Sequence, residues 1–236
     1  MNHRIVSLVP SLTEWLVALG LEEELVGITT FCVHPPSLLQ EKTKVGGTKN
    51  PNIDRIRSLN PTVVIMNKEE NREEDAQAIS EFSKVFVTEI STVEEAFSEM
   101  RRLAQFFKKS EVRVNELESL WDRIPKPGNG ESVLYLIWKK PWMGAGGDTY
   151  ISSVLNRLGY TNVLQDWDRY PEISIDFMGK IFPKRVFLSS EPYPFSEKHF
   201  AEVEAMFPWS KVELVDGEKY SWYGERMKWV EELLFD

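Results

Sequence analysis

Residues 53–66 read Ile-Asp-Arg-Ile-Arg-Ser-Leu-Asn-Pro-Thr-Val-Val-Ile-Met, a short helix pattern that a proline separates from an apolar strand. Residues 175–188 repeat this phrase at a constant offset of 122 residues. Several matches at one offset indicate two similar units within the chain. The matched positions are Ile53-Asp54 with Ile175-Asp176, Leu59 with Ile181, Pro61 with Pro183, and Val64–Met66 with Val186–Leu188.

Short apolar runs alternate with helix patterns in both parts of the chain. This alternation is typical of an α/β fold with mainly parallel sheets, in which the strands are buried on both faces. We therefore predict two similar α/β lobes. The predicted strands cover residues 5–9, 25–29, 63–66, 85–87, 133–138, 186–188 and 212–215.

The stretch between the repeats has a different pattern. From residue 92 to 124 apolar residues recur every three or four positions without a glycine or proline. We expect one connecting helix of about 32 residues, about 48 Å long at 1.5 Å per residue. The alternative is two helices broken near Lys109-Ser110. The predicted division is an N-terminal lobe over 1–91, the connecting helix over 92–125 and a C-terminal lobe over 126–236.

Composition limits the possible partners and compartments. The 236 residues carry a formal charge of −9, which argues against a nucleic-acid partner, and Cys32 is the single cysteine, so no internal disulfide forms. The N-terminus shows no export signal and no run is long enough to insert in a membrane. We expect a monomer that is cytoplasmic as given, and periplasmic or at the cell surface if a leader has been removed.

Open α/β sheets bind ligands at the carboxyl ends of their strands. The segments that follow the predicted strands are rich in Trp, Tyr, Glu and Asn. Their aromatic rings offer flat apolar surface for a large planar or ring-shaped ligand, although core packing explains each single ring about as well. Trp142, between Pro141 and Met143, is the ring least expected in the core. The aromatic candidates are Trp138, Trp142, Tyr193, Trp222 and Tyr223.

Several metal-ligating side chains follow the same strands. Cys32, His34, Glu69, Glu70 and Glu191 could collect around a soft or borderline metal ion. The Cys-x-His spacing followed by two prolines is no established metal motif, so a histidine that bonds within its own turn is favoured. A nucleophilic Cys32–His34 pair is weaker still. We assign no catalytic residue, resident metal or cofactor.

The segment Gly144-Ala145-Gly146-Gly147-Asp148 lies between a predicted strand and a predicted helix. This is the context of a phosphate-binding turn. Thr149 stands where the third glycine of a dinucleotide fingerprint would be, and the P-loop lysine is absent. An ordinary strand-to-helix turn is therefore the favoured interpretation.

Asp54 and Asp176 occupy matching places in the two lobes, two residues beyond the predicted helix caps. Acidic residues in a first helical turn interact favourably with the helix dipole, which is the simpler interpretation. The alternative is a pair of acidic docking points, one for each lobe.

Ser7–Glu14, Val26–Thr29, His34–Pro36, Val45–Gly47 and Asn52–Ile65 together resemble the class III, helical-backbone periplasmic binding proteins. These receptors deliver cobalamin, haem or iron-siderophores to ABC importers, and the resemblance to the cobalamin-binding members is the strongest. It spans nearly the whole chain. It implies two Rossmann-like lobes, one connecting helix and a ligand held in a cleft between the lobes.

The resemblance also implies roles for particular residues. Phe31, Thr48, Asn67 and Tyr170 stand where the cobalamin receptors carry aromatic residues that contact the corrin ring. Two of these positions remain aromatic and two are polar. Asp54 and Asp176 stand where those receptors carry the glutamates that dock on permease arginines.

The favoured hypothesis is a solute-binding protein, not an enzyme, that holds a corrinoid, haem or siderophore chelate for ABC-type uptake. The alternative is a cytosolic enzyme or metal-binding protein that uses the Cys, His and Glu residues of the same cleft. A third possibility, an interaction module that docks through Asp54 and Asp176, requires no ligand.

Overall fold

The computed structural model describes residues 3–126 and 129–234 in two compact units. Unit 1 comprises residues 1–90, 95–116 and 223–225, and unit 2 comprises residues 91–94, 117–222 and 226–236. The connecting segment is divided between the units, and a short C-terminal segment returns to unit 1.

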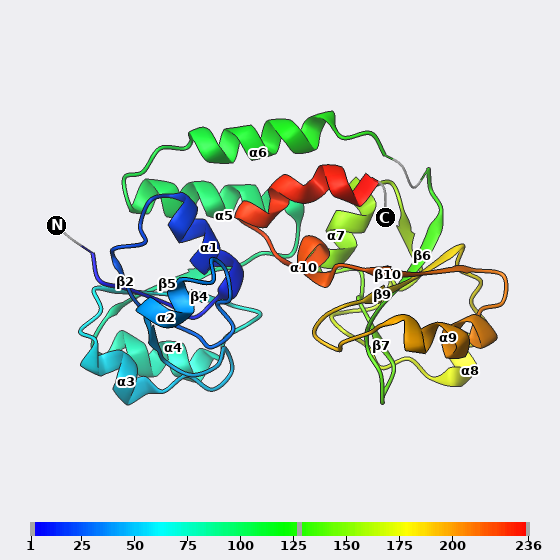
Figure 1. Ribbon diagram of the computed structural model, residues 1–236, viewed down its shortest axis with the longest axis horizontal. Helices are drawn as coiled ribbons and strands as arrows, with labels where there is room; N and C mark the ends of the chain where they lie inside the picture. The colour runs from blue at the N-terminus through cyan, green and yellow to red at the C-terminus, as the bar shows by residue number, and fades with distance from the viewer. Residues whose placement is uncertain (1–2, 127–128, 235–236) are drawn as a thin grey trace. The chain divides into compact units, whose positions relative to one another are not determined.

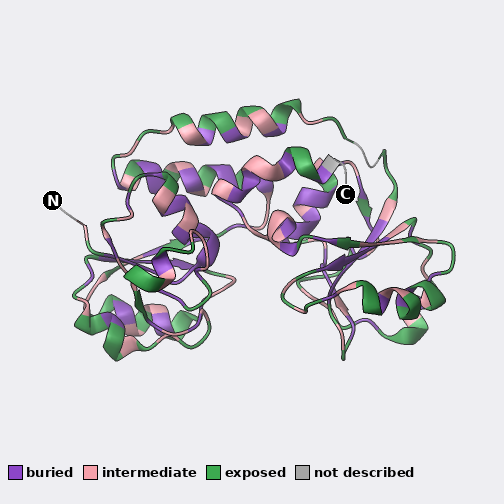
Figure 2. Cartoon of the chain, in the orientation of Figure 1, coloured by how far each residue is buried: buried purple, intermediate pink, exposed green. Residues whose placement is uncertain are grey.

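Unit 1 is built on a five-stranded parallel sheet of order β3-β2-β1-β4-β5. Its central strands are apolar, and Figure 2 shows them buried, because helices cover both faces of the sheet. Figure 1 shows α3 and α4 on one face of this sheet and α1 on the other. The elements are β1 Ile5–Ser7, α1 Pro10–Ala18, β2 Leu25–Ile28, α2 Leu38–Glu41, β3 Thr43–Lys44, α3 Ile53–Ser58, β4 Val63–Asn67, α4 Glu73–Ser80 and β5 Lys84–Thr88.

Unit 2 has a second five-stranded sheet, in which β10-β9-β6-β7 lie in order and β8 also pairs with β6. All its pairs are parallel except β6 with β7. Its elements are β6 Ser132–Trp138, β7 Met143–Gly144, α7 Tyr150–Arg157, β8 Thr161–Asn162, α8 Ile175–Met178, β9 Arg185–Ser189, α9 Phe200–Met206, β10 Lys211–Val215 and α10 Gly217–Ser221, with 3₁₀ helices at Glu197–His199 and Glu225–Leu234.

The repeated phrase forms corresponding structures in the two units. Asn52 caps α3 by accepting a hydrogen bond from the Arg55 amide, and Ser174 caps α8 in the same way through Phe177. A proline follows each helix and a buried strand begins soon after it. The predicted pair of α/β lobes with mainly parallel sheets is confirmed.

The single connecting helix is wrong, and the alternative of two helices is confirmed. Helix α5 covers Val93–Phe106 and helix α6 covers Val112–Arg123. Lys108 adopts a left-handed conformation with φ of 53°, which stops the first helix. The Ser110 hydroxyl then accepts a hydrogen bond from the Val112 amide and starts the second helix.

Among the described residues, no helix combines the length and the apolar character that crossing a bilayer requires.

Candidate functional site

Each unit places a group of the predicted residues at the carboxyl ends of its own strands. We call those after β2, β3 and β4 the unit 1 cluster and those after β6, β8 and β9 the unit 2 cluster. The unit 1 cluster contains Phe31, Cys32, His34, Thr48, Asn67, Glu69 and Glu70, and the unit 2 cluster contains Trp138, Trp142, Tyr170, Glu191 and Tyr193.

The loop after β4 is shaped by two buried asparagines. The Asn67 Oδ1 atom accepts hydrogen bonds from the Glu69 and Glu70 amides, at 2.8 and 3.2 Å. The Asn71 Oδ1 atom accepts from the Asn67 amide at 2.8 Å, and its Nδ2 donates to the Thr48 carbonyl at 3.0 Å. The Asn67 side chain therefore holds the loop, while Thr48, Glu69 and Glu70 stay half-buried.

Two aromatic residues of unit 1 lie in contrasting environments. Phe31, just after β2, is 57% exposed. Tyr223 is buried, and its hydroxyl donates to Glu70 Oε1 at 3.1 Å. Burial raises the pKa of this phenol. Phe31 therefore presents a ring to solvent, whereas Tyr223 serves the packing of unit 1.

Cys32 is fully buried, and its sulfur lies 3.1 Å from the hydroxyl oxygens of both Thr13 and Thr29. Burial raises the pKa of the thiol, which disfavours the reactive thiolate. His34 is half-buried in the turn before α2. In the part of the chain that the structure describes, no three His, Cys, Asp or Glu side chains are grouped so that they could hold a metal ion.

In unit 2 the two predicted tryptophans differ. Trp138, the last residue of β6, is 38% exposed, and its ring meets Tyr193 edge to face at 5.5 Å between centroids. Trp142 is only 8% exposed and stacks on Phe195 in the hydrophobic core of unit 2. The expectation that Trp142 lies outside the core is wrong, because a residue 53 positions away along the chain covers its ring.

Glu191, just after β9, organises the end of α10. Its Oε1 accepts a hydrogen bond from the Ser221 hydroxyl at 2.8 Å and another from the Trp222 indole nitrogen at 2.9 Å. Burial raises the pKa of this carboxyl, and the neighbouring Glu218 and Asp216 act in the same direction. Trp222 is therefore fixed by a carboxylate, and both side chains remain half-buried.

The glycine-rich segment 144–148 is an ordinary turn, as favoured. The amides of Gly146 and Gly147 donate to the carbonyls of Arg169 and Trp167, both at 2.8 Å. A Cβ at Gly147 would lie 1.8 Å from the Gln165 carbonyl oxygen, so the glycine allows two backbone segments to pack closely. The amides that a phosphate would need are already bonded within unit 2.

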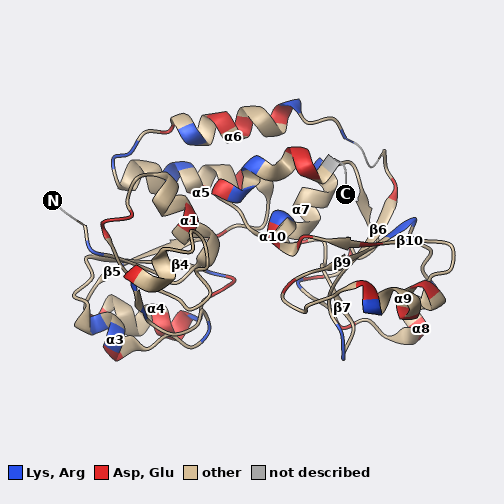
Figure 3. Cartoon of the chain, in the orientation of Figure 1, with Lys and Arg blue, Asp and Glu red and all other residues tan. Residues whose placement is uncertain are grey.

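Asp54 and Asp176 are both exposed in the first turns of α3 and α8. Figure 3 shows both signs of charge on α3, where Arg55 and Arg57 follow Asp54. Asp176 forms an ion pair with Lys180 one turn later. Each acid therefore occupies the predicted dipole position and remains accessible.

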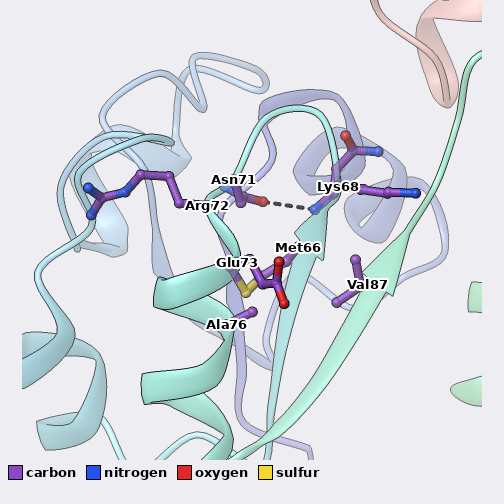
Figure 4. Close-up of a pocket in the computed structure, with 8 residues that line it drawn as sticks. Met66, Lys68, Asn71, Arg72, Glu73, Ala76 and Val87 are labelled. Atoms are coloured by element: carbon purple, nitrogen blue, oxygen red, sulfur yellow. Dashed lines mark hydrogen bonds between the residues drawn. The ribbon is translucent and has the colours of Figure 1, made fainter.

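A pocket of about 330 Å³ adjoins the unit 1 cluster and was not predicted from the sequence (Figure 4). Met66 of β4, Ala76 of α4 and Val87 of β5 line it, with Lys68 and Arg72 among the charged residues around them. In the sequence these three apolar residues belong to ordinary strand and helix patterns, so no signal separates them from the core.

The Periplasmic binding protein family profile matches residues 5–205. A vitamin B12-binding protein of Pectobacterium carotovorum is 21% identical over 202 residues, which cover 81% of this chain and 73% of that protein. A possible iron-binding (periplasmic solute-binding) protein of Staphylococcus epidermidis superposes with a TM-score of 0.80 at 20% identity, covering 100% and 98% of the two chains. The periplasmic heme binding protein of Vibrio cholerae superposes with a TM-score of 0.79 at 20% sequence identity, and the match covers 100% of this chain and 98% of that protein. These structural matches share the fold.

Proposed function

This chain belongs to the periplasmic binding protein family, and we propose that it is a solute-binding protein for a metal chelate of the corrinoid, haem or siderophore class. The relatives' names support this ligand class, since they include a vitamin B12-binding, a heme binding and a possible iron-binding protein. The proposed role is binding and delivery to an ABC permease in the periplasm or at the cell surface, without catalysis.

One observation carries the ligand proposal: each unit exposes an aromatic ring at the carboxyl ends of its strands. These rings are Phe31 in unit 1 and Trp138 in unit 2. An exposed ring leaves apolar surface in water, and a flat chelate that covers it gains binding free energy. We propose that each ring contributes to chelate binding within its own unit, Phe31 beside half-buried Thr48, and Trp138 beside half-buried Tyr170 and Tyr193.

The test measures tryptophan fluorescence and ligand absorbance while hydroxocobalamin, haemin or ferrioxamine B is added. We expect one of these chelates to bind, and Phe31→Ala and Trp138→Ala to weaken it at least tenfold. Phe182→Ala and Trp209→Ala are matched controls. Both rings are exposed, at 65% and 49%, but they precede β9 and β10 and so lie at the amino ends of these strands. Equal losses in the control variants, or no binding by any of the three chelates, would contradict the proposal.

For the permease we propose Asp54 and Asp176 as docking residues. Their support is their exposure and their equivalent positions after the caps of α3 and α8. The Asp54→Lys, Asp176→Lys double variant should bind its chelate normally but lose chelate-dependent ATPase stimulation in vesicles that contain its partner ABC permease. Unchanged stimulation would refute this docking role.

A further inference from the structure

The pocket beside β4 lies entirely within unit 1. Met66, Ala76 and Val87 line it from one central strand, one helix and the edge strand of the sheet (Figure 4). Its volume of about 330 Å³ is within the range of small-molecule sites. Val87 is 42% exposed although it lies within a strand, so its apolar surface is available to a bound molecule.

The neutral polar groups in the lining already have partners in the protein. The Asn67 side chain accepts from two loop amides and donates to Thr88 Oγ1. The Asn71 side chain accepts from the Asn67 amide and donates to the Leu8 and Thr48 carbonyls. Neither asparagine requires a hydrogen bond from a ligand.

The charged groups around the pocket are paired as well. Lys68 bonds to Glu89, and Arg72 forms two hydrogen bonds to the carboxylate of Asp75, at 2.9 and 3.0 Å. Glu73 accepts a hydrogen bond from Gln77 one turn along α4. A charged ligand group would compete with these partners for the same side chains, whereas an apolar group needs none of them.

We propose that this pocket binds an uncharged apolar group, either an aliphatic ring or a short alkyl chain. If the proposed function holds, that group is a substituent of the bound chelate, because Asn67 both lines the pocket and belongs to the unit 1 cluster. The apolar contacts come from Met66, Ala76 and Val87, and the aliphatic stems of Lys68 and Arg72 extend them.

A second cavity in the same unit provides an internal control. It has a similar volume, about 380 Å³, but is lined by His3, Arg4, Glu23, Glu24 and Val26. Its lining is mainly charged, so the same probe should not bind there.

The three apolar lining residues carry methyl groups, so the test uses methyl NMR of the intact chain labelled at Met, Ala and Val. Cyclohexanol should shift the Met66, Ala76 and Val87 signals saturably and leave the Val26 signals unchanged. Cyclohexanecarboxylate and cyclohexylamine should bind at least tenfold more weakly. From butan-1-ol to hexan-1-ol the affinity should rise about fourfold for each added methylene.

Ala76→Phe and Val87→Phe fill the pocket from different elements, so one remains informative if the other fails to fold. Either substitution should lower the affinity for cyclohexanol at least tenfold, whereas Val26→Phe in the control cavity should leave the affinity for cyclohexanol unchanged. Absent shifts, equal binding of the carboxylate, or unchanged binding in the filled variants would overturn the proposal.

The chelate titrations separate this result from the proposed function. If none of the three chelates binds but the methyl signals shift as expected, the chelate function is wrong and the pocket stands. If a chelate binds and the methyl signals never shift, the pocket proposal alone is wrong.

Discussion

Replacement of Trp142 by alanine should destabilise unit 2 strongly. The indole is 8% exposed and stacks on Phe195, with ring centroids 6.1 Å apart and planes 12° apart. A buried tryptophan removes about 200 Å² from water, which at about 25 cal/mol per Å² gives about 5 kcal/mol as an upper estimate. Measured losses for buried Trp→Ala changes are about 3–5 kcal/mol.

The assay is urea unfolding of wild type and Trp142→Ala, followed by far-UV circular dichroism and by fluorescence, because two units can unfold separately. The variant should lose about 3–5 kcal/mol in the transition that reports unit 2. Trp138→Ala is the matched control in the same region: its ring is 38% exposed, and we expect a loss of about 1 kcal/mol or less. A Trp142→Ala variant that unfolds like wild type but binds chelate poorly would show that Trp142 is a ligand residue.

Three further changes test the local structure. Glu191→Gln keeps an acceptor for Trp222 and removes a half-buried charge. Burial raises the pKa of this carboxyl above its ordinary 4.5, so the folded state binds more protons than the unfolded state, and wild type loses stability as the pH rises from 4.5. The difference in unfolding free energy between Glu191→Gln and wild type should therefore grow in favour of the variant as the pH rises. A difference that does not change with pH would contradict this. Gly147→Ala places a Cβ 1.8 Å from the Gln165 carbonyl oxygen and should cost more than about 3 kcal/mol in thermal or urea unfolding, unlike Gly179→Ala, where φ is −67° and the added Cβ meets no atom closer than 3.7 Å. Asn71→Ala removes three hydrogen bonds from the loop after β4 and should speed hydrogen exchange of the loop amides; unchanged exchange would refute this role.

The fold was predictable because its signals are local. Asn52 and Ser174 are caps that can be recognised in the sequence, and each accepts the expected hydrogen bond in the structure. The division between α5 and α6 was foreseen only as an alternative: Ser110 is a local start signal, but the break depends on the left-handed conformation of a lysine, Lys108, in a stretch without glycine. Sequence periodicity continues across such a break.

The candidate site was less predictable, because burial depends on distant residues. Trp142 is flanked by turn residues in sequence, yet Phe195 covers it. The hydrogen bond from the Trp222 indole nitrogen to Glu191 joins two residues 31 positions apart, and no sequence signal predicted it. Conversely, Val87 belongs to an ordinary strand pattern, and only its position in an edge strand leaves it exposed beside a pocket.

The return of residues 223–225 to unit 1 has a consequence for biosynthesis. Glu225 bonds through both carboxylate oxygens to Arg113, which is 112 positions earlier, and Tyr223 bonds to Glu70 across 153 positions. At translation rates of about 5–20 residues per second, Arg113 is made on the order of 10 s before its partner. The N-terminal unit therefore begins to leave the ribosome first but is not complete until residue 225, after nearly all of unit 2 has been synthesised.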